Sequence, residues 1–319
     1  MWLVATMLLA GCGGVASSPA GSTAKTGAPT VSATPTASES VGASSSAALS
    51  CLNRELAPVG LLKNQSIEAM GRMRTYEASV PDAANAGAPI PMVFVWHGDG
   101  DTGDAIRNRL ALEAAAADQP AIFVYPDGLE TPTGWWEMEQ HAAKNKDVAL
   151  FDALLERLEA SYCVDAARVF STGFSSGGFF TNHLACERGD RLRAIAPQSG
   201  GGPYWPDSAY NDDGQLKCPT HAVPALIIHG NDDPTVPNDA SPANLSGGWQ
   251  SFEHWAYWNH PAPRSGYAFE TDPVQAAPCV QARDLPDDHP VIRCFIDGLG
   301  HETWSEEAPT VWAFFSAFR

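Results

Sequence analysis

Residues 173–177 read Gly-Phe-Ser-Ser-Gly, a G-x-S-x-G pattern that is typical of a nucleophilic serine held on a sharp turn. Residues 167–172 predict a buried strand before it, and residues 178–186 predict a helix after it. A serine on such a turn exposes its hydroxyl above the sheet, and the flanking glycines tolerate the tight backbone. In a chain with 28 glycines the bare pattern can arise by chance, but its setting favours a nucleophilic role for Ser175.

A nucleophilic serine needs a base and an acid, and after a turn of this kind the acid and then a histidine follow along the chain. An apolar strand is predicted over 225–228, and a carboxylate, Asp233, lies in the loop beyond it. A second strand over 291–296 leads to the glycine-flanked His301. Because the carboxyl ends of parallel strands form the site in such sheets, we expect His301 to accept the proton of Ser175 and Asp233 to orient the imidazole.

An ester-cleaving serine also needs backbone N–H groups that stabilise a developing oxyanion. One donor should be the residue after the nucleophile, Ser176. The second should come from the loop after an earlier strand, and the apolar run 92–96 followed by His-Gly fits that description. We expect this second donor to be the N–H of Asp99, because Gly98 and Gly100 on either side allow close approach of the backbone to a substrate.

The elements that must position these groups alternate between strands and helices. Strands are predicted over 71–81, 92–96, 121–125, 167–172, 194–197, 225–228 and 291–296, and helices over 104–117, 148–161, 178–186 and 309–318. Such alternation predicts an α/β fold, a mostly parallel sheet with helices on both faces.

Beyond about residue 71 the chain resembles the secreted esterases grouped as polyhydroxybutyrate depolymerase-like and feruloyl esterase-like proteins. The stretches that carry the resemblance occur in the family's order: 95–98, 125–128, 162–170, 173–177, 229–234 and 300–304. The resemblance implies an α/β-hydrolase fold and a serine esterase that needs no cofactor. It places the nucleophile on Ser175, the base on His301, and the acid on Asp233 rather than on its neighbour Asp232.

Two positions depart from the family's pattern. Members often read Gly-His-Thr-Trp-Pro at the histidine, whereas Glu302 follows His301 here and no proline follows Trp304. Many relatives have an apolar residue or cysteine where this chain has Asp99. A carboxylate near a developing oxyanion is unfavourable unless it points away, so the orientation of Asp99 matters for the efficiency of the site.

Composition divides the chain into three parts. Residues 13–50 are almost entirely small or hydroxylated, which predicts a flexible tether and leaves 51–319 as one catalytic domain. The formal net charge of −18 argues against binding to nucleic acid or to anionic lipid through electrostatics.

The first twelve residues predict a lipoprotein-type signal. They are short and apolar, and Leu-Ala-Gly precedes Cys12 in the form of a lipobox. This resembles bacterial lipoprotein signals, in which the cysteine becomes the lipidated N-terminus. An ordinary secretory peptide is the alternative, and the absence of a basic segment suggests a true start upstream of Met1. We therefore expect an exported, extracellular or cell-surface protein whose only membrane contact is this anchor.

The remaining cysteines agree with export, because an even set in an exported enzyme predicts disulfides. They are Cys51, Cys163, Cys186, Cys218, Cys279 and Cys294. We expect a Cys163–Cys186 bridge, since both residues should lie at the lower edge of the sheet. The alternative is that some remain buried thiols.

Aromatic residues near the predicted site could line a substrate pocket. Trp135 and Trp136 follow the strand over 121–125, and Trp304 follows His301. Trp249, Phe252, Trp255 and Trp258 have near-helical spacing and are better read as core. Neither the acidic run 99–104 nor the histidine spacing fits a metal site, so no metal is predicted.

Together these features predict an exported serine esterase acting on polysaccharide- or polymer-linked esters. Feruloyl-type esters of plant polysaccharides are the preferred substrate, with polyhydroxybutyrate or acetylated xylan as alternatives. A different kind of protein, a catalytically weak surface lipoprotein that binds polysaccharide, is the remaining alternative.

Overall fold

The computed structural model describes residue 51 and residues 55–130, 135–138, 143–203, 218, 222–241, 244–261, 269–274 and 278–318. The predicted signal, Cys12 and the predicted tether over 13–50 lie outside the described residues. Within them, no helix is both long and apolar enough to cross a bilayer.

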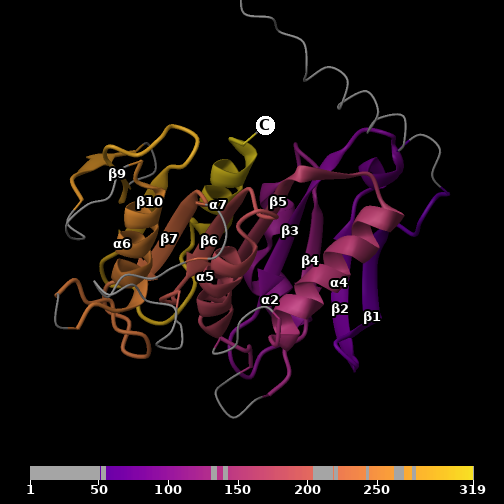
Figure 1. The fold of residues 1–319 in the computed structure, drawn as a ribbon, viewed down its shortest axis with the longest axis horizontal. Helices are drawn as coiled ribbons and strands as arrows, with labels where there is room; N and C mark the ends of the chain where they lie inside the picture. The colour runs from indigo at the N-terminus through magenta and orange to yellow at the C-terminus, as the bar shows by residue number, and fades with distance from the viewer. Residues whose placement is uncertain are drawn as a thin grey trace, which may run out of the picture. The chain divides into compact units, whose positions relative to one another are not determined.

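One mixed sheet organises the domain, with strand order β1-β2-β4-β3-β5-β6-β7-β10-β9-β8 (Figure 1). Its strands are β1 (Gly60–Ala69), β2 (Arg72–Val80), β3 (Ile90–Trp96), β4 (Ile122–Pro126), β5 (Val164–Phe174), β6 (Ala194–Gln198), β7 (Ala225–Gly230), β8 (Thr271–Pro273), β9 (Cys279–Ala282) and β10 (Val291–Ile296). The six from β4 to β10 in that order pair in parallel, whereas β1, β2, β9 and β8 pair antiparallel at the two edges. The carboxyl ends of the six parallel strands therefore meet at one edge of the sheet.

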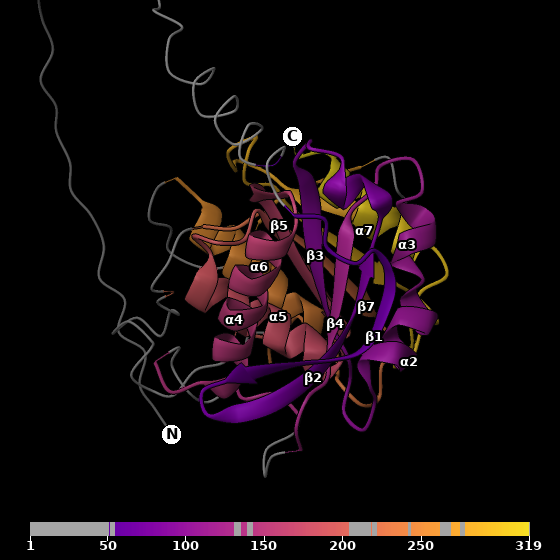
Figure 2. The same cartoon turned by 90° about the vertical axis from the view of Figure 1, so that its right-hand side faces the viewer.

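Helices cover both faces of this sheet, as the alternation predicted. Figure 2 views the sheet nearly edge-on, with α4, α5 and α6 on one side and α2, α3 and α7 on the other. The helices are α2 (Gly103–Leu110), α3 (Leu112–Ala115), α4 (Lys146–Ser161), α5 (Ser176–Arg188), α6 (Gly247–Asn259) and α7 (Glu307–Ser316), and a short 3-10 turn spans Asp82–Asn85.

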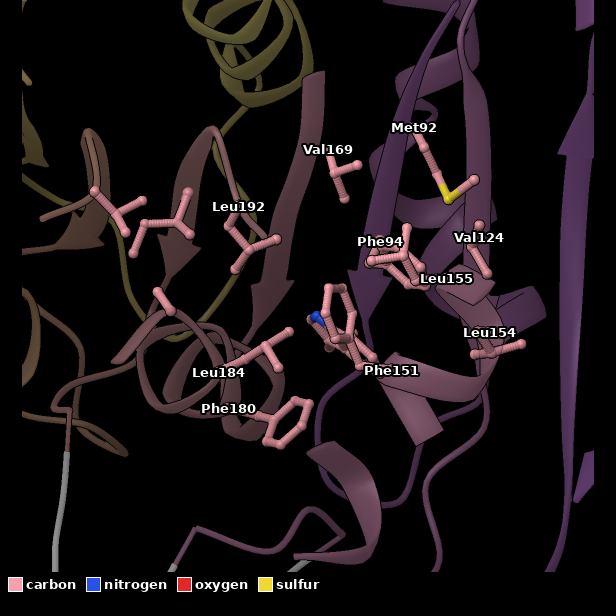
Figure 3. Close-up of a cluster of buried hydrophobic side chains, with 14 of the residues drawn as sticks. Met92, Phe94, Val124, Phe151, Leu154, Leu155, Val169, Phe180, Leu184 and Leu192 are labelled. Carbon is pink, nitrogen blue, oxygen red and sulfur yellow. The ribbon is translucent and has the colours of Figure 1, made fainter. Parts of the chain in front are cut away.

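The two helical layers explain why the central strands are apolar throughout. Along β3, Met92 and Phe94 pack into the core beneath α4 and α5, where Figure 3 shows Met92 near Val124 and Phe94 near Leu155. The alternate residue Val93 packs into the second core, which includes residues of α2 and α7. Strands buried on both faces show continuous apolar runs, which is why their positions could be predicted from sequence.

Several elements differ from the sequence prediction, among them the short strands β8 and β9, which were not predicted. The predicted helix over 104–117 is divided at Ala111, whose φ of 48° lies in the left-handed region, so that α2 ends there and α3 starts afresh. The edge strand β1 was not predicted, and most of its residues are exposed.

All six expected cysteines form disulfides, but the predicted Cys163–Cys186 bridge is wrong. The bonds join Cys51 to Cys163, Cys186 to Cys218, and Cys279 to Cys294. The segment that leads into β1 lies at the edge of the sheet where the parallel strands begin. There its carbonyls at Ala57 and Pro58 accept hydrogen bonds from Asn85 and Tyr162, and Tyr162 is the neighbour of Cys163. Cys186 pairs instead with the loop that precedes β7.

Candidate active site

Ser175 occupies the sharp turn between β5 and α5. Its φ of 55° and ψ of −120° are unusual for a non-glycine residue, and its N–H donates to the carbonyl of Gln198 at 2.9 Å. A side chain at Gly173 would place Cβ 2.5 Å from the carbonyl oxygen of Gly177, so this close turn needs glycine there. The sequence around the serine therefore builds a strained turn that points the hydroxyl out of the sheet.

The structure brings together the three residues that the sequence predicted for the chemistry. Nε2 of His301 lies 2.9 Å from Oγ of Ser175, and its Nδ1 lies 2.7 Å from Oδ2 of Asp233. A carboxylate can only accept, so Nδ1 carries the proton and Nε2 is left to accept from the serine hydroxyl. Asp233 is completely buried, whereas the His301 side chain is 18% exposed and can meet a substrate.

The loop after β7 determines which of its two aspartates meets His301. Oδ1 of Asp233 accepts the N–H groups of Thr235 and Val236, each at 2.8 Å, which leaves Oδ2 for the imidazole. Asp232 is exposed and instead accepts the N–H of Gly298 at 2.7 Å. The geometry thus agrees with the choice of Asp233.

A second imidazole lies against the same carboxylate. His229, at the end of β7, is buried, and its Nε2 donates to the carbonyl of Val236 at 2.9 Å while lying 3.4 Å from Oδ2 of Asp233. Burial, the largest effect, lowers the pKa of His229 below the ordinary histidine value. The ring is therefore neutral and braces the loop that carries Asp233.

Of the residues predicted to bind the oxyanion, Ser176 directly follows Ser175, and Asp99 follows Gly98, which lies against Ser175. Ser176 is the first residue of α5, so its N–H has no carbonyl partner within the helix. The loop after β3 passes close to the nucleophile, since a Cβ built on Gly98 would lie 3.3 Å from Cβ of Ser175. The Asp99 carboxylate, which departs from the family's pattern, accepts the backbone N–H of Trp135 at 3.1 Å. The carboxylate is therefore held by the loop after β4.

Three tryptophans were predicted to line a pocket, and for Trp136 that prediction is wrong. It is fully buried, packs on Trp96 and Phe180, and donates its indole N–H to the carbonyl of His97 at 2.8 Å. Trp135 is half-buried, with its ring centroid 6.0 Å from that of His97. Trp304 is also half-buried, packed against the core on the α7 side. Phe252 and Trp255 of α6 are core residues, as expected.

The loop that follows His301 is fixed to the start of α7 by a reciprocal pair of hydrogen bonds. The N–H of Trp304 donates to Oε2 of Glu307 at 2.9 Å, and the N–H of Glu307 donates to the carbonyl of Trp304 at 3.0 Å. Complete burial raises the pKa of Glu307 to about 8. The hydrogen bond from the Trp304 N–H and the positive charge of Arg109 lower this pKa, but by less than burial raises it.

Sequence reasoning assigned no role to two histidines that the structure places at the site. His97 and His229 each stand directly before a glycine at the carboxyl end of a parallel strand. That shared position was the available signal. Among the described residues, no group of three or more potential ligands is arranged to hold a metal ion.

Residues 83–244, just over half of the chain, match the sequence profile of the phospholipase/carboxylesterase family. The chain belongs to that family. Within 172 aligned residues it is 35% identical to a probable feruloyl esterase C of Aspergillus niger and 36% identical to feruloyl esterase C of Emericella nidulans. Each alignment covers 52% of this chain and 57% of the relative, so the chain spans little more than half the length of these proteins.

Solved structures with the same fold include other esterases. An acetyl xylan esterase from Aspergillus awamori superimposes with a TM-score of 0.57 at 17% identity, over 80% of this chain and 99% of that protein. A feruloyl esterase module from Clostridium thermocellum gives 0.54 at 16% identity, over 83% and 90%. At these identities the likeness concerns the fold, and the predicted α/β-hydrolase fold of this family member is confirmed.

Proposed function

We propose that this protein is a serine carboxylic-ester hydrolase. The observation that carries the proposal is the hydrogen-bonded series from Ser175 through His301 to Asp233 at the carboxyl edge of the sheet. Nucleophilic catalysis requires a serine on a strained turn, an imidazole nitrogen that can accept its proton, and a carboxylate that holds the imidazole. Here Nε2 of His301 accepts from Ser175, and the buried Asp233 accepts from Nδ1.

In the proposed reaction Oγ of Ser175 attacks the ester carbonyl while Nε2 of His301 takes its proton. The N–H groups of Ser176 and Asp99 stabilise the oxyanion of the tetrahedral intermediate. His301 then returns the proton to the departing alcohol, which leaves an acyl-enzyme on Ser175. Water, activated by the same imidazole, releases the acid, and Asp233 stabilises the imidazolium at both stages.

For the substrate we propose feruloyl-type esters of plant polysaccharides. Support comes from the names of the aligned relatives and from the half-buried Trp135, whose ring could stack on an aromatic acyl group or a sugar. Polyester and acetylated xylan are the alternatives within the same chemistry. A surface lipoprotein that binds polysaccharide without turnover is the alternative of another class.

We further propose that the protein is exported and carried on a lipid anchor at Cys12. The three disulfides support export, because such bonds persist in oxidising compartments. Acyl-chain labelling of the wild type and of a Cys12→Ala variant would test the anchor, and equal labelling of both would reject it.

Hydrolysis of p-nitrophenyl acetate by the wild type and by Ser175→Ala tests the chemistry. The variant should fold normally and lose several orders of magnitude in kcat, because residues of such a unit act together. Undiminished turnover by folded Ser175→Ala would reject the mechanism. Comparing methyl ferulate, acetylated xylan and polyhydroxybutyrate films on one preparation then ranks the substrates, and film clearing without ferulate release would overturn the preference.

A further inference from the structure

His97 is a fully buried imidazole that uses both ring nitrogens. Nε2 lies 2.8 Å from the backbone nitrogen of Gly128, and Nδ1 lies 2.7 Å from the carbonyl oxygen of Gly98. The Gly128 N–H can only donate, so Nε2 must accept and the single proton of the ring lies on Nδ1, where it donates to Gly98. The two contacts therefore define one neutral tautomer.

The loop that carries His97 is joined to the loop after β4 at further points. The indole N–H of Trp136 donates to the carbonyl of His97 at 2.8 Å, and the N–H of Trp135 donates to Oδ1 of Asp99 at 3.1 Å. The junction is closely packed, because a Cβ on Gly128 would lie 3.2 Å from Nε2 of His97 and 3.0 Å from the carbonyl oxygen of Trp135. The His97 ring is thus held from both sides.

The Gly98 carbonyl, which accepts from His97, belongs to the same peptide unit as the N–H of Asp99. A trans peptide is planar, with its C=O and N–H pointing in opposite directions. Fixing the direction of the Gly98 oxygen therefore also fixes the direction of the Asp99 N–H, and Gly98 itself lies against Ser175. The N–H of Asp101 also donates to this oxygen, at 3.2 Å, but the His97 contact, at 2.7 Å, is the shorter one. An imidazole that never meets the substrate can in this way aim an oxyanion donor.

Burial is the largest effect on His97 and lowers the pKa of its ring below the ordinary value. The charged groups that face it are Asp127 beyond β4 and Asp101 and Asp99 on its own loop, and each opposes that effect. The net lowering keeps the ring neutral at neutral pH. The neutral form is required because a proton on Nε2 would leave two donors, Nε2–H and the N–H of Gly128, facing each other and would break that hydrogen bond.

We propose that His97 is a positioning residue for the oxyanion hole, in which its neutral imidazole holds the Gly98–Asp99 peptide so that the Asp99 N–H faces the reacting carbonyl. This inference rests on the proposed esterase function. It assigns His97 no proton transfer and no substrate contact. Its effect is confined to the transition state, where the oxyanion exists.

The test measures kcat and KM for p-nitrophenyl acetate, and the inhibition constant of a trifluoromethyl ketone, which forms a tetrahedral oxyanion on the serine. In His97→Leu we expect kcat to fall about 10²-fold with KM little changed, as for loss or misplacement of one oxyanion donor. The ketone should bind more weakly by a similar factor. His97→Gln supplies a side-chain acceptor for Gly128 and should recover part of the loss.

Two further variants separate positioning from general destabilisation. Gly128→Ala presses a methyl group on the His97 ring from the other loop and should show the same kcat-selective defect. His183→Gln alters another fully buried histidine, which contacts Asn145 on the α4 side, and should leave kcat unchanged even where it lowers the melting temperature.

The outcomes distinguish this inference from the function on which it rests. If the wild type and Ser175→Ala turn over the ester equally, the proposed function fails. If Ser175→Ala is inactive but folded His97→Leu keeps full kcat and full affinity for the ketone, the role of His97 is rejected. A defect in His183→Gln as large as that in His97→Leu would also reject it.

Discussion

Replacing Glu307 with glutamine should stabilise the protein by an amount that grows as the pH rises from about 4.5 to about 8. The carboxyl group is buried at the start of α7, where burial raises its pKa to about 8 from an ordinary value of 4.5. The folded state therefore holds this proton more tightly than the unfolded state does. Stability is complete below about pH 4.5 and falls as the pH rises through the window up to about 8.

The size of the effect follows from the shift in the pKa of Glu307. One pKa unit is worth about 1.4 kcal/mol, so the loss is about 1 kcal/mol at pH 5 and about 3 kcal/mol at pH 7. Above pH 8 it approaches at most about 5 kcal/mol. Glutamine does not ionise in this range and its side-chain oxygen can still accept the N–H of Trp304. In a domain of this size, 3 kcal/mol corresponds to about 6–12 °C in melting temperature.

Urea unfolding without reductant at pH 5.5 and pH 8.5, with the disulfides intact, measures this difference. Glu307→Gln should be more stable than the wild type by about 1.4 kcal/mol at pH 5.5 and by about 4–5 kcal/mol at pH 8.5. Glu306→Gln removes an exposed charge from the neighbouring position and serves as the control. If the pH dependences of wild type and Glu307→Gln run parallel, the reasoning about the buried proton is wrong.

Three further predictions concern the acid, a buried ion pair and a half-buried histidine. Asp233→Asn should lower kcat on the order of 10³–10⁴-fold by favouring the wrong imidazole tautomer, whereas Asp232→Asn should cost far less, and the reverse ranking would move the acid by one residue. Arg74→Met should destabilise the fold by about 3–5 kcal/mol in urea unfolding because it leaves the buried carboxylate of Asp147, 2.6 Å away, unpaired. The double variant with Asp147→Leu should recover much of that loss, and additive losses would argue against the pairing. Burial lowers the pKa of His254 to about 4, so its contribution to stability is present above about pH 6.5 and is lost as the pH falls toward 4. In His254→Phe the free energy of unfolding should therefore fall by about 3 kcal/mol less than in the wild type between pH 6.5 and pH 4. An equal fall in both proteins would contradict the lowered pKa of His254.

The sequence predicted those parts of the site that depend on local pattern. Ser175, Asp233 and His301 each follow an apolar strand, and strands buried on both faces are legible as continuous apolar runs. The edge strand β1 lacks that signal, because most of its residues, Lys63 among them, are exposed. Its pairing with β2 also contains an irregularity between Leu62 and Gln65.

Other features depend on tertiary packing and could not be predicted in the same way. Trp135 and Trp136 are adjacent in sequence, yet one is half-buried beside the site and the other is fully enclosed by the core. The partner of Cys163 was decided by a segment that returns to the sheet over a sequence separation of 112 residues. Such long-range returns leave no periodic mark in the sequence.

The Cys51–Cys163 bond also fixes where the first described residue of the chain is attached to the sheet. Cys163 stands just before the first residue of β5 and Ser175 just after the last, so the 11 residues of that strand separate them, a span of roughly 35 Å. The preceding chain is therefore attached at the pole of the domain opposite the nucleophile. Any chain joined at Cys51 is thus held a full strand length from Ser175, and its attachment leaves the carboxyl edge of the sheet, where the ester must reach the serine, unobstructed at that point.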